Sequence, residues 1–338
     1  MIEIRELDPD DAPAVQAWHH VYAVAQAHGM GEHAVVWQLE EVRVLLRERT
    51  SRAWHAGWSG VVDGEVVATG WMRVPLLDNL DRAELSVHVL PAHRRRGHGS
   101  AMVAHLEQVA REHGRTILGG EAAFAYDAGA DGAGAPGPDF ARTAGYALAL
   151  GDVQRELALP VADGLLDRLA AEAAPHHASY TLRSWVGPVP DELLQGWADL
   201  TSTLMTEAPT GELDVEPEAA SATAVREGEA VVAQQGRTKI NTVALTADGE
   251  VVAYTDLAVT VHESDRAYQW GTLVRADHRG HRLGLALKVA NLRLLQESHP
   301  GLAKVVTYNA EVNDHMIGVN DRLGFVPVAR LAEFQKRL

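Results

Sequence analysis

The 338-residue sequence contains no cysteine. This absence excludes disulfide bonds, thiolate zinc sites and a cysteine nucleophile, and it makes the cytoplasm the expected compartment. No apolar run approaches the ~18 residues that a membrane-spanning helix needs. The first residues, MIEIRELDPDDAPAV, also lack the basic start and apolar block of a signal peptide.

Positive charge is scarce, since 30 Lys and Arg stand against 46 Asp and Glu for a formal net charge of −16. Such a surface repels nucleic acids and anionic lipids, so neither a nucleic acid nor a membrane is an expected partner. The 17 histidines show no HExxH or similar ligand spacing. No metal site is therefore expected, and a bound anion would require a local basic pocket.

The chain repeats itself over a long period. The segment DGEVVA occurs at 63–68 and again at 248–253. At the same spacing, VLPAHRRRGHG at 89–99 is followed by the similar segment VRADHRGHRLG at 274–284. Asp-Gly between alternating apolar residues is a common hairpin turn, so the first match alone would mean little. The second match in the same order indicates a duplicated domain. The predicted boundaries are an N-terminal domain at 1–156, a connecting segment at 157–179 and a C-terminal domain at 180–338.

Each copy is predicted to be α+β, with a mixed, mostly antiparallel sheet and helices on both faces. In the first copy the expected elements are a strand at 3–7, helices at 10–28 and 35–48, a hairpin on Asp63-Gly64, a strand at 83–91, a helix at 100–114, a strand at 116–124, a short helix at 140–144 and a last strand past Tyr146. The second copy repeats this order: 180–186, 190–205, a hairpin on Asp248-Gly249, 267–274, 285–297, 304–310, 313–323 and a strand from Phe325. The segments 127–139 and 207–219 are predicted to be mobile loops because they are rich in Gly, Pro and acidic residues.

One strand–loop–helix unit of the first copy has the composition of an anion site. Arg94-Arg95-Arg96-Gly97-His98-Gly99 separates the strand from the helix at 100–114. A helix N-terminus offers unpaired N–H groups and partial positive charge, glycine lets a phosphate approach the backbone, and arginine binds phosphate bidentately. A solvated basic loop is the alternative. Dinucleotide and Walker phosphate loops fit worse, because Met102 stands where a third glycine is needed and no GK[ST] follows.

Arg94-x-x-Gly97-x-Gly99, after Val89-x-Pro91 and before an amphipathic helix, resembles motif A of the GNAT superfamily of N-acetyltransferases. The element order resembles that fold across nearly the whole of each copy, and the tandem layout is similar to that of mycothiol synthase. The resemblance implies acetyl-CoA as the cofactor, with the pyrophosphate of coenzyme A on the loop and the pantetheine arm along the strand. The cofactor-binding residues that it implies in the first copy are Val87, Val89, Arg94, Arg95, Arg96, Gly97, His98, Gly99 and Ser100.

The second copy departs from this motif at one glycine. Its loop reads Arg279-Gly280-His281-Arg282-Leu283-Gly284, so Arg282 replaces the first motif glycine and either narrows the cradle or adds a phosphate contact. Its C-terminal stretch resembles the family better, with Asn313 at a cofactor-contacting asparagine, but Asn320 replaces the tyrosine that usually protonates the thiolate. An amide is no general acid. The cofactor-binding residues implied here are Thr272, Val274, Arg279, Gly280, Arg282, Gly284, Asn313 and Asn320.

Acyl transfer from a thioester requires a neutral amine and N–H donors for the oxyanion. Glu84 is the candidate base of the first copy, because family members often place a carboxylate at this point of the central strand; a half-exposed strand-end glutamate is the alternative. In the second copy, Glu311 and Asp256 are the nearest carboxylates, and Tyr308 or Tyr268 is the candidate acid.

The sequence therefore predicts transfer of an acetyl group from acetyl-CoA to the amine of a small molecule. The acidic total and the acidic loop at 207–219 favour a cationic acceptor. A non-catalytic acyl-CoA-binding module or sensor and an interaction scaffold are the alternatives. The identity of the acceptor, the copy that turns over, and the choice between monomer and homodimer stay open.

Overall fold

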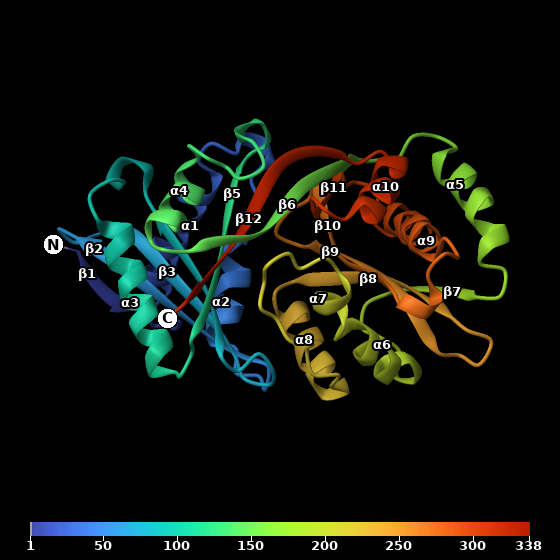
Figure 1. Cartoon of the computed structure of the whole chain (residues 1–338), viewed down its shortest axis with the longest axis horizontal. Coiled ribbons are helices and arrows are strands. Elements are labelled where there is room, and N and C mark those ends of the chain that lie inside the picture. The colour runs from blue at the N-terminus through green and yellow to red at the C-terminus, as the bar shows by residue number, and fades with distance from the viewer. Residues whose placement is uncertain (1) are drawn as a thin grey trace. The chain divides into compact units, whose positions relative to one another are not determined.

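The computed structural model describes residues 2–338, which form two compact units (Figure 1). Unit 1 combines a continuous part of the chain with two short segments from elsewhere, and unit 2 is the remaining part. Unit 1 comprises Met1–Asp152, Gly211–Asp214 and Ala329–Leu338, and unit 2 comprises Val153–Thr210 and Val215–Val328.

Unit 1 is built on a mixed sheet. Its strands are β1 (Glu3–Glu6), β2 (Ala53–Val62), β3 (Glu65–Pro75), β4 (Arg82–Val89), β5 (Ile117–Ala125) and β12 (Val326–Arg337). They lie in the order β1-β2-β3-β4-β5-β12, and the expected hairpin turns at Asp63-Gly64, where both residues have positive φ. All described pairs are antiparallel except β4 with β5, which is parallel. That parallel pairing covers only Arg82–Leu85 of β4, so the strand runs on to Val89 beyond it.

Helices cover both faces of this sheet. They are α1 (Ala12–Ala27), α2 (Leu39–Arg47), α3 (His98–Glu112) and α4 (Pro136–Thr143). Because side chains alternate along a strand, Met72 faces α3 and joins a core with Met102 and Leu106. Trp71 faces the other way, 6.0 Å from the ring of Trp18 on α1. The sequence thus places Trp18 and Trp71 together under α1, and a separate core that includes Met72, Met102 and Leu106 under α3.

Unit 2 repeats the architecture. Its strands are the end of β6 (Ala147–Ala158), β7 (Thr181–Val186), β8 (Arg237–Leu245), β9 (Val251–Thr260), β10 (Arg266–Val274) and β11 (Lys304–Ala310). They lie in the order β6-β11-β10-β9-β8-β7, again with one parallel pair, β10 with β11. The register of β10 against β9 shifts between Gln269 and Thr272, which marks a β-bulge.

One helix of unit 2 was not predicted from the sequence. The helices of this unit are α5 (Leu165–Ala173), α6 (Leu194–Thr201), α7 (Leu204–Glu207), α8 (Ala222–Gln234), α9 (Leu283–Ser298) and α10 (Asp314–Leu323). The missed helix is α8, which begins at the N-cap Ser221 directly after the acidic loop. The connecting segment expected at 157–179 contains α5, which packs on α9 through Leu166, Leu169 and Ala173. No helix among residues 2–338 is long and apolar enough to cross a membrane.

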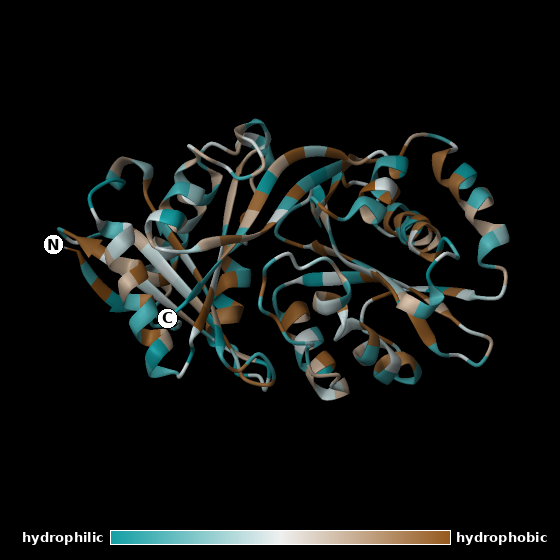
Figure 2. Cartoon of the chain, in the orientation of Figure 1, coloured by the Kyte–Doolittle hydropathy of each residue, from teal (hydrophilic) through white to brown (hydrophobic). Residues whose placement is uncertain are grey.

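The two units exchange their last strands. β6 ends the first repeat but its residues from Val153 belong to unit 2, and β12 ends the second repeat but pairs along Ala329–Arg337 with β5 of unit 1. Hydrophobic and hydrophilic residues interleave along β12 (Figure 2). The domains predicted from the sequence, at 1–156 and 180–338, do not include this exchange of strands. The structure therefore groups residues 329–338, expected in the C-terminal domain, with unit 1.

Both segments expected to be mobile loops are partly fixed. Within 207–219, the amide of Glu212 donates to the carbonyl of Ala149 at 2.9 Å, and Asp214 contacts Arg82 and Arg337. Two arginines therefore hold part of this acidic loop on unit 1. Within 127–139, α4 already begins at Pro136, a residue that suits the first turn of a helix.

Candidate functional site

The Arg-Gly loop of unit 1 has the geometry of an anion cradle. Gly97 is the N-cap of α3 with φ +84°, and Arg95 also takes a positive φ of 61°. Arg94 supports the loop from behind, because its Nε donates to the carbonyl of Val89 at 3.2 Å. A Cβ built on Gly97 meets no atom within 4 Å, so the space in front of the N-terminus of α3 is open.

The same loop is accessible and cationic. Arg95, Arg96, Gly97 and Ser100 are exposed, and Arg96 donates only to the carbonyl of Ala92, at 3.1 Å. In the described part of the chain, no carboxylate forms an ion pair with any of the three loop arginines. Burial, followed by the charges of neighbouring cations, lowers the pKa of His98. The loop therefore presents positive charge and free N–H groups to solvent.

The loop of unit 2 has the same backbone conformation with two residues interchanged. Gly280 (φ +87°) stands where unit 1 has Arg95, and Arg282 (φ +52°) stands where unit 1 has Gly97. Arg279 repeats the support of Arg94, donating to the carbonyl of Val274 at 3.2 Å. The substitution of the motif glycine therefore left the turn intact but added a side chain at the N-cap of α9.

The arginines of that loop are paired with the protein's own carboxylates. The Glu172 carboxylate on α5 contacts both Arg282 and Arg322 of α10, and Arg279 pairs with Glu207 at 2.7 Å. The first turn of α9 is buried from Leu283 onward, whereas the first turn of α3 is partly exposed. The arginines of this loop are thus paired with carboxylates of the protein, whereas those of the first loop have no carboxylate partner among the described residues.

Three further residues expected at the cofactor in unit 2 also have partners within the protein. Asn313 caps α10 by accepting from the amide of Met316 at 3.1 Å. Asn320 is fully buried, accepts from Lys288 Nζ at 2.8 Å and donates to Asn309 at 2.5 Å. Burial lowers the pKa of Lys288 to about 7. Thr272 shares a 2.8 Å hydrogen bond with Thr255.

The candidate base lies in a group of carboxylates on one face of the unit 1 sheet. Glu84 is exposed on β4, opposite Gly119, and pairs with Arg73 at 2.7 Å. Two residues further along β5, Glu121 lies directly opposite Glu333 of β12. All three glutamates point the same way because side chains two residues apart share a face. Three strands thus bring three carboxylates together.

Two of these carboxylates, Glu121 and Glu333, have raised pKa values. Burial, then the charges of Glu84 and Asp152, raises the pKa of Glu121 to about 7, although solvent reaches this side chain. Burial, then the charges of Glu121 and Asp152, raises the pKa of Glu333 to about 8, against the opposing effect of Arg82. Glu121 thus titrates near neutral pH, as a general base should.

The sequence pattern points to Glu84 but not to Glu121 or Glu333. The alternation of Gly119 and Glu121 in the expected strand would have placed Glu121 on the face of Glu84, given the pairing of the two strands. No local signal marks Glu333, because its partner on β5 is far away in the sequence.

The other catalytic candidates lie in unit 2. Tyr308 is half-buried on β11, and its hydroxyl donates to Gln154 at 3.2 Å. Glu311 follows the end of the same strand and is partly exposed. Tyr268 donates to Glu263. Asp256 forms an ion pair with Lys239 at 2.6 Å.

Comparisons with known proteins agree with this architecture. The model of the Acetyltransferase (GNAT) family matches residues 15–123. A tandem GNAT protein from the clavulanic acid biosynthesis pathway, solved without AcCoA, is 29% identical with a TM-score of 0.79, over 100% of this chain and 98% of that chain. A GCN5-related N-acetyltransferase from Sphaerobacter thermophilus (16% identity, TM-score 0.64, 99% and 95% covered) and Saccharomyces cerevisiae N-myristoyltransferase with bound myristoyl-CoA (10%, 0.59, 99% and 79%) share the fold. No curated protein matches the chain significantly. The expected tandem α+β architecture is confirmed.

Proposed function

We infer from the tandem GNAT layout of this chain, with its GNAT acetyltransferase domain matched over residues 15–123, that unit 1 acetylates the amine of a small cationic molecule. The family implies acyl-CoA-dependent N-acyltransferase activity. The proposal adds the acetyl donor, the acceptor class and the unit in which the reaction occurs. The observation that carries it is the open, unpaired Arg-Gly loop of unit 1, next to a sheet face lined with carboxylates.

The residues of unit 1 fit the pyrophosphate of coenzyme A. Gly97 leaves room at the N-terminus of α3, where free N–H groups and the helix dipole favour an anion. Arg95 and Arg96 supply charge from the exposed side of the loop, and Arg94 holds its backbone. When bound, acetyl-CoA supplies an activated acetyl thioester. The N–H groups of β4 around Val89 are our candidates for stabilising the oxyanion.

Coenzyme A is expected to bind once per chain, because Glu172 and Glu207 neutralise the arginines of the unit 2 loop. Arg96→Ala should weaken binding about tenfold or more, the effect of losing a charge-assisted hydrogen bond. Arg282→Ala is the matched control and should leave the affinity unchanged. Isothermal titration calorimetry gives both the stoichiometry and the affinity; two sites per chain, or a loss in the control variant, would contradict the assignment to unit 1.

The carboxylates of unit 1 support a cationic acceptor. Glu84, Glu121, Glu333 and Asp152 surround one region of the sheet, and like charges placed directly opposite are unfavourable without a counter-charge. Within residues 2–338, no group of three or more His, Asp or Glu could hold a metal ion. An ammonium group from the acceptor would balance this charge. The ring of Tyr22, whose pKa is raised by burial and by carboxylates including Glu121, lies near the same region.

We assign the proton acceptor to Glu121 and keep Glu84 as the second candidate. Glu84 is already held by Arg73, which favours a role in binding the ammonium group. Glu121 exchanges its proton near pH 7, so its carboxylate can take the proton that the ammonium loses before attack. The amine nitrogen then forms its bond to the acetyl carbon, the bond from that carbon to sulfur breaks, and the departing thiolate of coenzyme A takes the second proton that the nitrogen loses.

The absence of cysteine gives a direct assay of this proposal. A thiol reagent added to the reaction detects only the coenzyme A that is released, since the chain has no thiol. We expect turnover with polyamines, aminoglycosides or basic amino acids, and none with their N-acetylated forms. If no cationic amine accelerates thiol release although acetyl-CoA binds, unit 1 would instead be an acyl-CoA-binding module or sensor. Loss of both binding and turnover would leave only a scaffold role.

Glu333→Gln is expected to stabilise the protein at high pH alone. A raised pKa means that Glu333 holds its proton more tightly in the folded protein than in the unfolded chain. Ionised Glu333 therefore destabilises the folded protein, and this destabilisation grows as pH rises from about 4.5 to about 8. The variant should therefore melt about 2–4 °C higher than wild type at pH 9 and at the same temperature at pH 4. Differential scanning calorimetry measures this, with exposed Glu65→Gln as the control. Equal melting temperatures at pH 9 would show that the carboxylates do not interact.

A further inference from the structure

Four residues of the acidic loop belong to unit 1 and lie beside the carboxylates of its sheet. We call this segment, Gly211–Asp214, the strap. The amide of Glu212 donates to the carbonyl of Ala149 at 2.9 Å. Gly211 has a φ of +58°, and a Cβ built on it would clash with that same carbonyl oxygen. A glycine is therefore needed where the strap meets β6.

The last residue of the strap binds two arginines. Arg82 of β4 donates to the carbonyl of Asp214, and Arg337 of β12 pairs with its carboxylate. Arg82 is two residues before Glu84, so the two side chains lie on one face of the sheet. Arg337 is four residues after Glu333 and lies on the same face. Asp214 therefore binds the cations at one end of the row of carboxylates.

Arg82 stops short of the two glutamates that lie opposite each other. Its Nη2 is 3.7 Å from a Cβ built on Gly119, the residue opposite Glu84. Glu121 and Glu333 lie two residues further along the sheet. Within residues 2–338, no cation forms an ion pair with either glutamate. The guanidinium group of Arg82 is thus near two carboxylates with which it does not pair.

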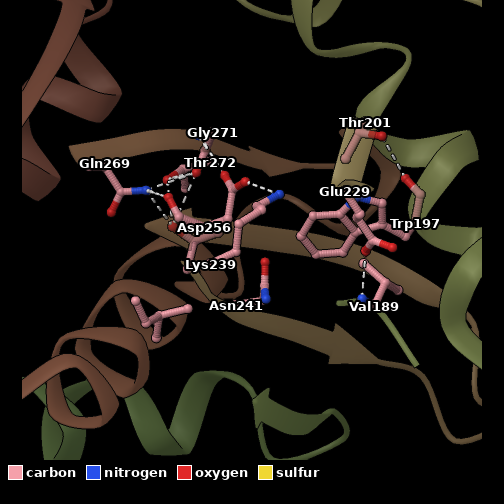
Figure 3. A network of polar contacts seen from close by, with 12 residues as sticks. Val189, Trp197, Thr201, Glu229, Lys239, Asn241, Asp256, Gln269, Gly271 and Thr272 are labelled. Atoms are coloured by element: carbon pink, nitrogen blue, oxygen red, sulfur yellow. Dashed lines mark hydrogen bonds and ion pairs between the residues drawn. The ribbon is translucent and has the colours of Figure 1, made fainter. Parts of the chain in front are cut away.

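Unit 2 shows the arrangement that these two glutamates lack (Figure 3). On the face of its sheet under Trp197 of α6, Lys239 of β8 pairs with Asp256 of β9 at 2.6 Å. The cation comes from the neighbouring strand, so the sheet neutralises its own carboxylate. In unit 1 the strap instead binds the arginines next to Glu121 and Glu333.

We propose that the strap, through Asp214, keeps these two arginines away from Glu121 and Glu333 and so leaves both carboxylates to the ammonium group of the acceptor. Asp214 is thus a positioning residue for the acceptor site, a role that rests on the function proposed for unit 1. Without its carboxylate, Arg82 and Arg337 are free to turn toward Glu333 and replace the ammonium group. The strap therefore makes unit 1 selective for cationic amines.

The charges around the two glutamates predict the direction of the effect. Besides the two arginines, the titratable groups that face them are Glu84 of β4 with its partner Arg73 of β3, Asp152 of β6 and Tyr22 of α1. Burial and the neighbouring carboxylates raise the pKa of Glu333 to about 8, and Arg82 opposes this. An arginine that moves closer should therefore lower the pKa of both glutamates.

Carbon NMR titration of the glutamate carboxyl groups between pH 4 and 10 tests this without coenzyme A or an acceptor. Glu121→Gln and Glu333→Gln assign the two signals. Asp214→Asn should lower the pKa of Glu333 by about 1 or more, as an adjacent arginine does. Glu212→Gln is the matched control, because it removes the same charge from the same strap at an exposed residue without an ion pair in the described structure. It should lower the pKa by about 0.3 or less, since water and salt screen an exposed charge.

A second variant displaces the strap without changing its charge. Gly211→Val would clash with Ala149, so the pKa of Glu333 should fall as it does in Asp214→Asn. Gly129→Val is its control, because Gly129 also has a positive φ (+85°) but no atom within 4 Å of a built Cβ. The inference is overturned if Asp214→Asn leaves both pKa values unchanged, if Glu212→Gln lowers them equally, or if Gly211→Val has no more effect than Gly129→Val.

The thiol-release assay separates this inference from the proposed function. Asp214→Asn should raise KM for a cationic amine about fivefold or more, because an arginine competes with the ammonium group, and should move the rise of rate to lower pH. A purely structural strap would change the melting temperature and leave the pH profile as it is. If the carboxyl groups titrate as expected but no amine is acetylated, the proposed function fails and the placement of the arginines by Asp214 stands. If amines are acetylated with the same pH profile in Asp214→Asn and wild type, the inference fails and the proposed function stands.

Discussion

Gly97→Trp is expected to lower the affinity for coenzyme A at least 100-fold. A tryptophan at the N-cap of α3 would fill the open space that Gly97 leaves in front of the free N–H groups. It would also hold the φ of +84° at an energetic cost, because residues with a Cβ rarely adopt this conformation. Calorimetric titration with coenzyme A measures the loss. The expected size corresponds to losing the backbone contacts of a phosphate group together.

Gly114→Trp controls for the strain itself. Gly114 directly follows the other end of α3, has a φ of +71° and likewise has no atom within 4 Å of a built Cβ. Its substitution imposes the same backbone cost on the same helix without touching the loop. We expect both variants to melt at similarly reduced temperatures while only Gly97→Trp loses affinity. If the two bind coenzyme A equally well, the cofactor does not lie on this loop.

Glu121→Gln is expected to lower kcat/KM for the amine about 100-fold or more, the usual effect of removing a general base. The wild-type kcat/KM should rise with pH through about 7, because the base acts as the carboxylate and its pKa is raised to that value by burial, Glu84 and Asp152. The variant should lose this rise and keep only the dependence that comes from the acceptor's own ammonium group. Initial rates of thiol release between pH 5.5 and 9 measure both effects.

Glu84→Gln distinguishes the two carboxylates. If Glu84 binds the ammonium group, its variant should raise KM more than it lowers kcat, and the rise of rate with pH should stay, shifted to lower pH because a negative charge near Glu121 is gone. A flat pH profile in Glu84→Gln together with a normal one in Glu121→Gln would reverse the assignment. Coenzyme A affinity should be the same in both variants.

The elements of both repeats were largely predictable because their signals are local. Asp63-Gly64 and Asp248-Gly249 mark hairpins through the residues that positive φ favours, and α9 begins within two residues of its expected start. The Arg-Gly loops were identified from spacing, and the open cradle of unit 1 agrees with the expected role of Gly97. The sequence could not predict that the turn accommodates Arg282, because a positive φ at a residue with a Cβ is seen only in the structure.

The features that could not be predicted from the sequence depend on contacts between distant parts of the chain. Glu333 reaches Glu121 only because β12 pairs with β5, and a pairing register between distant strands has no local signature. Glu172 belongs to a connecting helix that no motif covers, yet it contacts Arg282 of the second loop and Arg322 of α10. The contacts of Asp214 could not be predicted for the same reason, because its two arginines are more than a hundred residues away in the sequence.

The exchanged strand β12 has a consequence for protein synthesis. The sheet of unit 1 contains Ala329–Arg337, so its sixth strand is synthesised only after the whole of unit 2. At about 5–20 residues per second, the interval between Asp152 and that strand is roughly 10–40 s. Throughout this interval, β5 presents an unpaired edge. A chain cut before β12 would therefore leave the first sheet without its sixth strand.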